Sequence, residues 1–152
     1  MTETTSYAYD LYLSYTDADR AWVATELLPD LVQRGLRICL PERDFDIGRP
    51  RLDNIERAIA RSRHTLIVMT PAWLASEWQE FEGLLVSTTD PAGRLRRLIP
   101  LLLEACPLPP RIAMLTYADF TDPAQRSLAM KRLLRLEYAS SDFHQLQASC
   151  RP

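Results

Sequence analysis

One short stretch of the chain gathers side chains that can do chemistry. It reads Ser76-Glu77-Trp78-Gln79-Glu80-Phe81-Glu82 and holds an indole, an amide and three carboxylates within two helical turns. In a helix, Trp78 and Glu82 are four residues apart, so the carboxylate lies one turn from the indole on the same face. The stretch follows an apolar run from Thr65 to Met69 that is typical of a buried strand. It is therefore the first candidate for a site.

The same stretch also fits an ordinary amphipathic helix. Trp78, Phe81 and Leu85 recur at helical spacing and would form a core-facing stripe. On this interpretation the carboxylates are solvated, and Glu77 and Glu80 in particular are expected to be surface charges. The segment by itself leaves both interpretations open.

Size and composition indicate one globular domain. The chain has 152 residues, of which 47% are hydrophobic and 25% charged, and its net charge is −2. This balance gives no general attraction to nucleic acid or to an anionic membrane, and we expect neither as a partner. The cysteines Cys39, Cys106 and Cys150 are far apart and lack zinc spacing, so we expect no metal site and a cytoplasmic, reducing environment. No apolar run has the length of a membrane span, and residues 1–5 lack the basic and apolar regions of a signal peptide, so we expect neither.

Strand-like and helix-like segments alternate about five times along the chain. This alternation predicts a flavodoxin-like α/β three-layer sandwich, with a central five-stranded parallel sheet and helices on both faces. Helices are expected between the strands, with apolar positions such as Val23, Leu27 and Leu31 in the first, Leu52, Ile55 and Ile59 in the second, and Leu128, Leu133 and Leu136 in the last. We expect strands at residues 9–13, 37–40, 65–69, 98–103 and 115–120.

Three positions carry local expectations. Pro29 should kink the first helix, because it removes a backbone donor. Pro100 is unfavourable in a central strand, because it also lacks the N–H that would bond to a neighbouring strand. Ser76, with Gln79 three residues later, resembles a capping box and predicts a helix that begins at Ser76 and ends near Val86.

In a parallel sheet, ligands bind beyond the carboxyl ends of the strands. Polar residues gather at three such places: Ser14 and Tyr15 after the first strand, the charged loop from Glu42 to Arg49 after the second, and the Ser76 to Glu82 stretch after the third. We expect these places to form one site.

At these places the sequence resembles the Toll/interleukin receptor (TIR) domain family. Residues 9–15, Tyr-Asp-Leu-Tyr-Leu-Ser-Tyr, are similar to the first box of the family, and residues 43–48, Arg-Asp-Phe-Asp-Ile-Gly, to the second. Ser76, Trp78 and Glu82 match the Ser-x-Trp-Cys-x-x-Glu motif of the third helix. The resemblance covers residues 7–138, with residues 1–6 as a leader and 139–152 as a tail or linker. It implies the flavodoxin-like fold predicted above.

The resemblance implies an enzyme that cleaves nicotinamide from NAD. We expect it to be a bacterial-type effector module of immune or antiviral signalling. By position, Glu82 resembles the catalytic glutamate. Nicotinamide leaves as a neutral base, so one carboxylate that stabilises the sugar cation is sufficient, and no cofactor besides the substrate NAD is expected. Substrate contacts are expected from six residues: Ser14, Tyr15, Arg43, Gly48, Arg49 and Trp78. Whether the product is linear or cyclic ADP-ribose stays open.

The resemblance implies homotypic TIR–TIR assembly as well, driven by a fused or separate sensor domain. The interface residues expected in the loop after the second strand are Asp44, Phe45, Asp46 and Ile47. Ile47 replaces the proline of the second box, which leaves the loop more flexible. The alternative function is a scaffold that uses the same surfaces without catalysis.

Two other classes on similar sheets fit less well. A phosphorylation-receiving domain needs acidic residues at the ends of the first and third strands, where this chain has Ser14-Tyr15 and Met69-Thr70. A Rossmann oxidoreductase needs a G-x-G-x-x-G after the first strand, which is missing.

Overall fold

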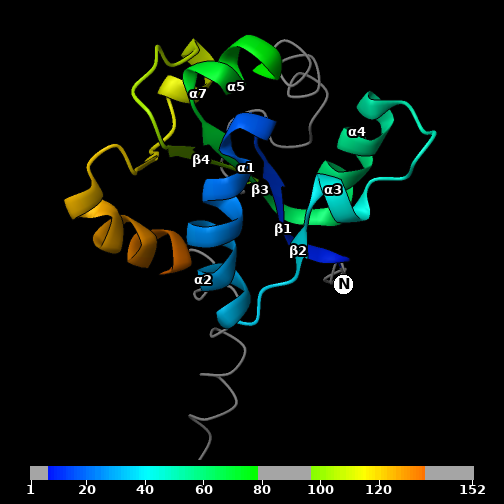
Figure 1. Cartoon of the computed structure of the whole chain (residues 1–152), viewed down its shortest axis with the longest axis horizontal. Coiled ribbons are helices and arrows are strands. Elements are labelled where there is room, and N and C mark those ends of the chain that lie inside the picture. The colour runs from blue at the N-terminus through cyan, green and yellow to red at the C-terminus, as the bar shows by residue number, and fades with distance from the viewer. Residues whose placement is uncertain (1–6, 79–96, 136–152) are drawn as a thin grey trace, which may run out of the picture.

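The computed structural model describes residues 7–78 and 97–135. Its centre is an all-parallel five-stranded sheet with the strand order β2-β1-β3-β4-β5 (Figure 1). The strands are β1 (Tyr9–Ser14), β2 (Ile38–Cys39), β3 (Ser62–Met69), β4 (Leu98–Leu102) and β5 (Ala118–Asp119). The predicted five-stranded parallel sheet is confirmed.

Helices connect the strands. The first connection contains η1 (Asp17–Asp19), α1 (Arg20–Trp22), the π-turn η2 (Val23–Leu27) and α2 (Leu28–Gln33), and the second contains α3 (Pro41–Asp44) and α4 (Arg51–Arg61). Further along the chain lie α5 (Pro71–Ser76), α7 (Pro110–Ala113), η3 (Pro123–Gln125) and a helix over residues 126–135.

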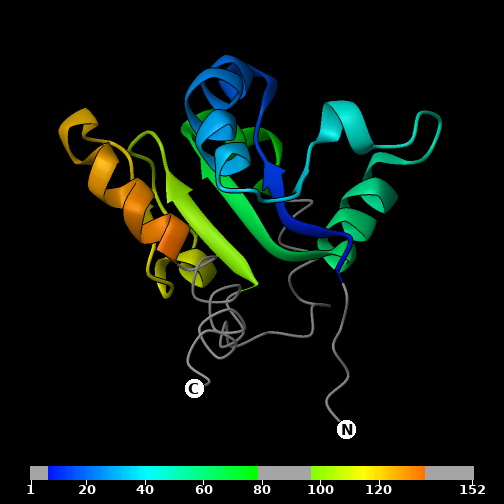
Figure 2. The same ribbon diagram turned by 90° about the horizontal axis from the view of Figure 1, so that it is seen from below.

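The helices form a layer on each face of the sheet, because side chains of a strand alternate between its two faces. Leu11 and Leu13 of β1 belong to one buried cluster, which also contains Leu27 of the first helix and Leu133 of the last. Tyr12 of β1 belongs to the second cluster, together with residues of α4, α5 and α7. Figure 2 shows the last helix (orange) running alongside β4. The flavodoxin-like three-layer arrangement is thus confirmed.

Pro100 lies in β4, between β3 and β5, without breaking the sheet. Thr65 N bonds to Arg97 O and Leu103 N bonds to Met69 O, just before and just after β4. With the register of the two strands, these bonds show that the backbone N–H and C=O groups of odd-numbered β4 residues point towards β3. Pro100 therefore faces β5, which pairs with β4 only at Leu101 and Leu102. Because no strand pairs with β4 at the level of Pro100 on that side, its missing N–H costs the ladder nothing.

Pro29 leaves the first helix continuous as far as Gln33. The π-turn η2 ends two residues before Pro29, and Leu28 N bonds to Val23 O across five residues. A wider turn gives the proline ring room. The chain therefore accommodates Pro29 with a π-turn.

Some details of the prediction are wrong. The hydroxyl of Ser76 donates to Ala72 O at 2.9 Å, so Ser76 is the last residue of α5 and caps no helix start. The first three residues of the predicted Glu42–Arg49 loop, Glu42 to Asp44, belong to α3. Leu52 and Leu128 are exposed, because the neighbouring positions of their helices face the core.

Candidate functional site

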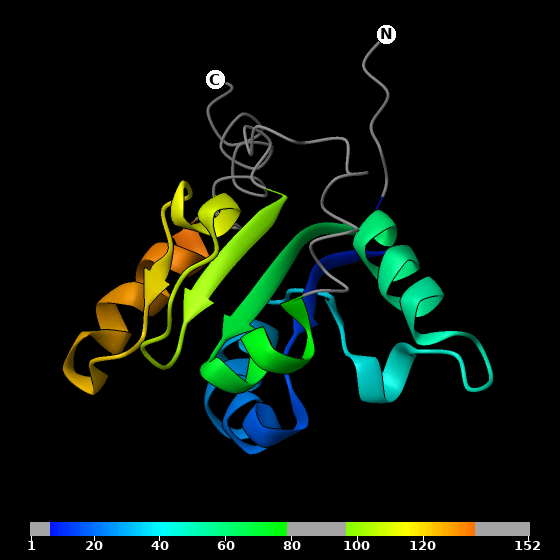
Figure 3. The same ribbon diagram turned by 90° about the horizontal axis from the view of Figure 1, so that it is seen from above.

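The carboxyl ends of β1 and β3 meet at one edge of the sheet. Ser14 ends β1 and Met69 ends β3, and the two strands are parallel neighbours. Figure 3 shows that α5 (green) continues directly from the tip of β3. Because parallel strands end together, residues that follow β1 and β3 lie close in space although they are more than 50 positions apart.

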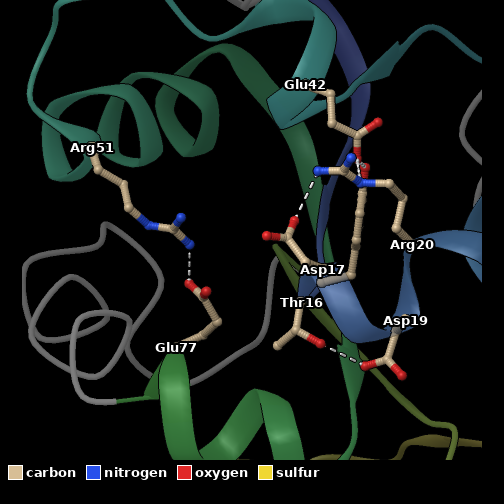
Figure 4. Close-up of polar contacts among 8 residues, drawn as sticks. Thr16, Asp17, Asp19, Arg20, Glu42, Arg51 and Glu77 are labelled. Carbon is tan, nitrogen blue, oxygen red and sulfur yellow. Dashed lines mark hydrogen bonds and ion pairs between the residues drawn. The ribbon is translucent and has the colours of Figure 1, made fainter.

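Buried hydrogen bonds tie these two strand ends together. Asp19 Oδ2 accepts from Thr16 Oγ1 at 2.9 Å (Figure 4). The same oxygen accepts from Thr70 Oγ1 at 2.8 Å. Thr70 Oγ1 in turn accepts from Trp73 N at 3.1 Å and so caps α5. Trp73 Nε1 donates to Ser14 Oγ at 3.1 Å. The start of α5 is therefore fixed to the end of β1.

Trp73 was not identified from the sequence, yet it is the centre of this edge. Its side chain is fully buried, and its ring lies 6.0 Å from the ring of Trp78 at an angle of 49°. The signal that could have found it is Thr70-Pro71, a cap followed by proline at the first helical position, which places Trp73 in the first turn. Trp78 thus packs against a residue that is bonded to Ser14.

Tyr15 lies in a charged group beside this edge. Its hydroxyl donates to Glu42 Oε1, and Arg20 Nε lies 3.2 Å from the same carboxylate oxygen. Arg20 also pairs with Asp17 at 2.8 Å (Figure 4). Burial and the bond to Glu42 raise the pKa of Tyr15, so the phenol stays protonated. Tyr15 and the α3 segment are therefore in contact, as the sequence predicted for their strand ends.

The α3 segment is organised by Asp44. Its Oδ2 accepts from Leu40 N at 2.8 Å, and its carboxylate pairs with Arg43 at 2.9 Å. Burial acts to raise the pKa of Asp44, but the bonds from Arg43 and the Leu40 N–H outweigh it and lower the pKa. Phe45, the next residue, packs against Tyr12 with ring centroids 5.9 Å apart. Asp44 and Phe45 thus hold the beginning of the loop against β1 and β2.

The rest of the loop is organised by Asp46. Its carboxylate pairs with Arg49 at 3.1 Å and with Arg57 of α4 at 3.0 Å. Gly48 has φ +88°, a positive backbone angle that glycine adopts without strain. The side chain of Ile47 is 105% exposed, so an apolar residue stands fully in solvent at the loop. These residues therefore form a compact, charged loop with one apolar tip.

Glu77 is not a surface charge as the sequence suggested. Its side chain is 13% exposed and pairs with Arg51, the first residue of α4 (Figure 4). This pair links the end of the loop to the residue that follows α5. The structure thus brings Ser14, Trp78 and Glu77 to one edge, while Arg43 and Arg49 are engaged by neighbouring carboxylates.

Glu82 lies outside the described residues, as do Glu80 and the rest of the helix expected to end near Val86. Within residues 7–78 and 97–135, no group of three or more His, Cys, Asp or Glu side chains could hold a metal ion. In the same part of the chain, none of the helices is both long and apolar enough to cross a membrane.

The all-parallel sheet with helices on both faces defines a flavodoxin-like α/β domain. In such folds ligands bind beyond the carboxyl ends of the strands. A family model described as the TIR domain matches residues 11–134. The chain therefore belongs to the TIR domain family. The match lies inside the predicted domain, residues 7–138, whose boundaries stay predictions.

Similar proteins carry the same domain. The chain is 34% identical over 126 residues to Toll-like receptor 12 of Mus musculus, covering 79% of the chain and 12% of the receptor. It is 33% identical over 120 residues to the stimulator of interferon genes protein of Magallana gigas, covering 76% of the chain and 29% of that protein. Among solved structures, the TIR domain of the Toll-related receptor TRR-2 from Hydra magnipapillata superposes with a TM-score of 0.71 and 27% identity, covering 84% of this chain and 96% of that one.

The chain spans only 9% to 12% of the Toll-like receptors 6 and 12 that it matches. The similarity therefore concerns one domain of these proteins.

Proposed function

We propose that this TIR domain cleaves nicotinamide from NAD, with Glu82 as the catalytic carboxylate, when several copies assemble in innate immune or antiviral signalling. The observation that supports this proposal is the contact of Trp78 with Trp73, whose indole is bonded to Ser14 at the end of β1. This contact holds Trp78, four residues before Glu82, at the carboxyl edge of the sheet, where ligands bind in parallel sheets.

The chemistry needs little more than one carboxylate. The nicotinamide of NAD is a cationic pyridinium that leaves as a neutral base, so no general acid is required. As the bond to the ribose lengthens, positive charge develops on the sugar, and the carboxylate of Glu82 stabilises this charge in a site that excludes water. Glycosidases of the ordinary type use two carboxylates, because their leaving group must be protonated.

Other residues are proposed to bind the rest of NAD. Tyr15 would contact the ribose, Trp78 would shield the reacting ring, and Arg43 and Arg49 would bind the phosphates, which match guanidinium geometry. Both arginines are partly exposed and paired with aspartates, so phosphate would compete with Asp44 and Asp46 for them. Gly48 would let the loop backbone approach the ligand. This exchange of partners couples substrate binding to a rearrangement of the loop.

The test measures NAD consumption by concentrated or artificially clustered protein. We expect Glu82→Gln to abolish the loss of NAD, because the amide keeps the shape of the side chain and removes its charge. Glu56→Gln, on the exposed side of α4, is the matched control and should retain activity. Mass analysis of the products distinguishes linear from cyclic ADP-ribose. Equal NAD loss in the native protein and in Glu82→Gln would overturn the role of Glu82.

A second candidate function is a scaffold in which TIR domains associate without catalysis. The full exposure of Ile47 favours it, because an apolar side chain in solvent at a loop tip is suited to contact with another subunit. The similar proteins with receptor names also fit a signalling role. In this case the cytoplasmic assembly would recruit partners, and a fused or separate sensor domain would control it.

Charge at the loop tip separates the two functions. Ile47→Glu should prevent self-association in analytical ultracentrifugation, whereas Met114→Glu, at another exposed apolar side chain, should leave it unchanged. If the domain is an enzyme, NAD cleavage is lost together with assembly in Ile47→Glu. A scaffold would show the same loss of association while the native protein consumes no NAD.

A further inference from the structure

A chain of buried hydrogen bonds at the end of β1 has no role in the proposed chemistry. It runs from Ser14 through Trp73 and Thr70 to Asp19, with donor–acceptor distances of 3.1, 3.1 and 2.8 Å. Ser14 is 4% exposed, Asp19 8%, Thr70 1% and Trp73 0%. The Ser14 hydroxyl is buried and already accepts a hydrogen bond from the Trp73 indole.

The direction of each bond is fixed by the groups at the two ends. A carboxylate only accepts hydrogen bonds, so the Thr70 hydroxyl donates its proton to Asp19 and keeps its lone pairs for Trp73 N–H. An indole nitrogen only donates, so Ser14 Oγ is the acceptor. Thr16 donates to the same oxygen of Asp19, which fixes that carboxylate from the side of η1. The donor and the acceptor of each of these bonds are therefore assigned.

This chain of bonds leads towards the proposed catalytic segment. Trp73 packs against Trp78 with ring centroids 6.0 Å apart, and Trp78 precedes Glu82 by four residues. A rotation of the Trp73 ring would change the surface on which Trp78 rests. Enzymes are sensitive to such shifts, since a displacement of about 1 Å can lower a rate about a hundredfold.

We infer that Ser14 and Asp19 are positioning residues: Ser14 fixes the Trp73 indole against Trp78, Asp19 orients Thr70, and neither contacts NAD. The positions of the side chains do not depend on the proposed function, whereas their effect on catalysis rests on it. It gives Ser14 a different role from the substrate contact that the sequence suggested, and it adds Asp19, Thr70 and Trp73 to the residues that matter at this edge.

Circular dichroism tests the placement of the two indoles without any substrate. Two tryptophan rings this close couple and give a paired positive and negative signal, and a Trp22→Phe background removes the other indole of the chain. In this background we expect Ser14→Ala and Thr70→Val to lose at least half of the signal and Thr70→Ser to keep it. Thr25→Val removes an exposed hydroxyl that bonds only to Ala21 O, and it should change nothing.

Kinetics of clustered protein test the link to catalysis. We expect Ser14→Ala to lower kcat about ten- to a hundredfold while KM stays within about threefold, because the substrate contacts remain and the reacting geometry is lost. Thr70→Ser should restore most of the rate lost in Thr70→Val. A raised KM in Ser14→Ala with an unchanged circular dichroism signal would overturn the inference and make Ser14 a substrate contact.

The two proposals fail in different ways. If the native protein consumes no NAD, the proposed function fails, and the circular dichroism of Ser14→Ala still decides whether Ser14 fixes Trp73. If NAD is consumed and the signal of Ser14→Ala equals that of the native protein, the positioning role is wrong while the proposed function stands.

Discussion

Trp73 Nε1 donates a hydrogen bond to Ser14 Oγ at 3.1 Å, across 59 positions of the sequence. The bond joins the carboxyl end of β1 to the first turn of α5, and both side chains are buried. The segment that contains Ser14 and the stretch that contains Trp78 therefore meet at one edge of the sheet, because both contact Trp73.

Removal of the acceptor should destabilise the domain. In Ser14→Ala the indole N–H of Trp73 stays buried without its partner, and such a loss costs about 1–3 kcal/mol of unfolding free energy. Urea unfolding measures this change. In a double-mutant cycle with Trp73→Phe, the two changes should couple by more than about 0.5 kcal/mol, since both delete the same bond. Strict additivity of the two changes would show that the bond contributes nothing to stability.

The pair of Arg51 and Glu77 should contribute modestly to stability. Glu77 is mostly buried, but the Arg51 side chain is 59% exposed, so water screens the pair. We expect Glu77→Gln to lower the unfolding free energy by about 0.2–1 kcal/mol at low salt and by less at high salt. Asp17→Asn is the matched control: Asp17 pairs with Arg20, and its side chain is 92% exposed. A larger effect in Asp17→Asn than in Glu77→Gln would contradict the link between burial and strength.

The sequence predicted the parallel sheet and both helical layers, because these follow from local periodicity and from strand order. A site at the carboxyl ends of the strands stays a prediction. Val23, Leu27 and Leu31 are buried as their spacing predicted. Cys39, in the short strand β2, is buried as well. Such features depend on contacts near in sequence or on simple burial.

The partners of polar groups could not be predicted in the same way. Spacing in the sequence gives no sign that Ser14 bonds to Trp73 or that Glu77 pairs with Arg51, because these contacts join separate elements. Ser76 fits a capping box by residue type, but it is the last residue of α5, which begins at Pro71 with Thr70 as its cap. After the turn at Glu77 the chain is helical again at Trp78, so the expected second helical stretch begins two residues later than the pattern predicted.

Stability should fall in alkaline solution. Burial raises the pKa of Cys39 from 9.0 to about 12, and burial also raises the pKa of Tyr12 above 10.0. As pH rises above 9, the unfolded chain loses these protons first, so it is favoured progressively until the folded groups also ionise. Urea unfolding at pH 8, 9.5 and 11 should therefore show a decreasing unfolding free energy. The decrease that is due to the Cys39 thiol should continue up to about pH 12, where the folded thiol ionises as well.

The contribution of the Cys39 thiol to this pH dependence of the unfolding free energy can be measured with a variant. Cys39→Ala removes the ionisable group and should reduce the slope between about pH 9 and pH 11, while the part due to Tyr12 remains. In the native protein at pH 8, Cys39 should also react with a thiol reagent only after unfolding, because its thiol is buried and protonated. A slope that Cys39→Ala leaves unchanged would contradict this assignment.

Substitutions of Gly48 and Gly35 can distinguish a specific role of the loop in assembly from a general loss of stability. Gly48 has φ +88° and Gly35 φ +80°, and an added Cβ would meet no atom within 4 Å at either position. Alanine should therefore cost about 1–2 kcal/mol at both sites, from backbone strain alone. Equal losses in urea unfolding are expected. Only Gly48→Ala should also weaken self-association and NAD cleavage, because Gly48 follows the exposed Ile47 in the loop proposed to contact the neighbouring subunit, whereas Gly35 follows α2. If Gly35→Ala impaired assembly as much as Gly48→Ala, the effect would come from lost stability, and the loop would lose its proposed role.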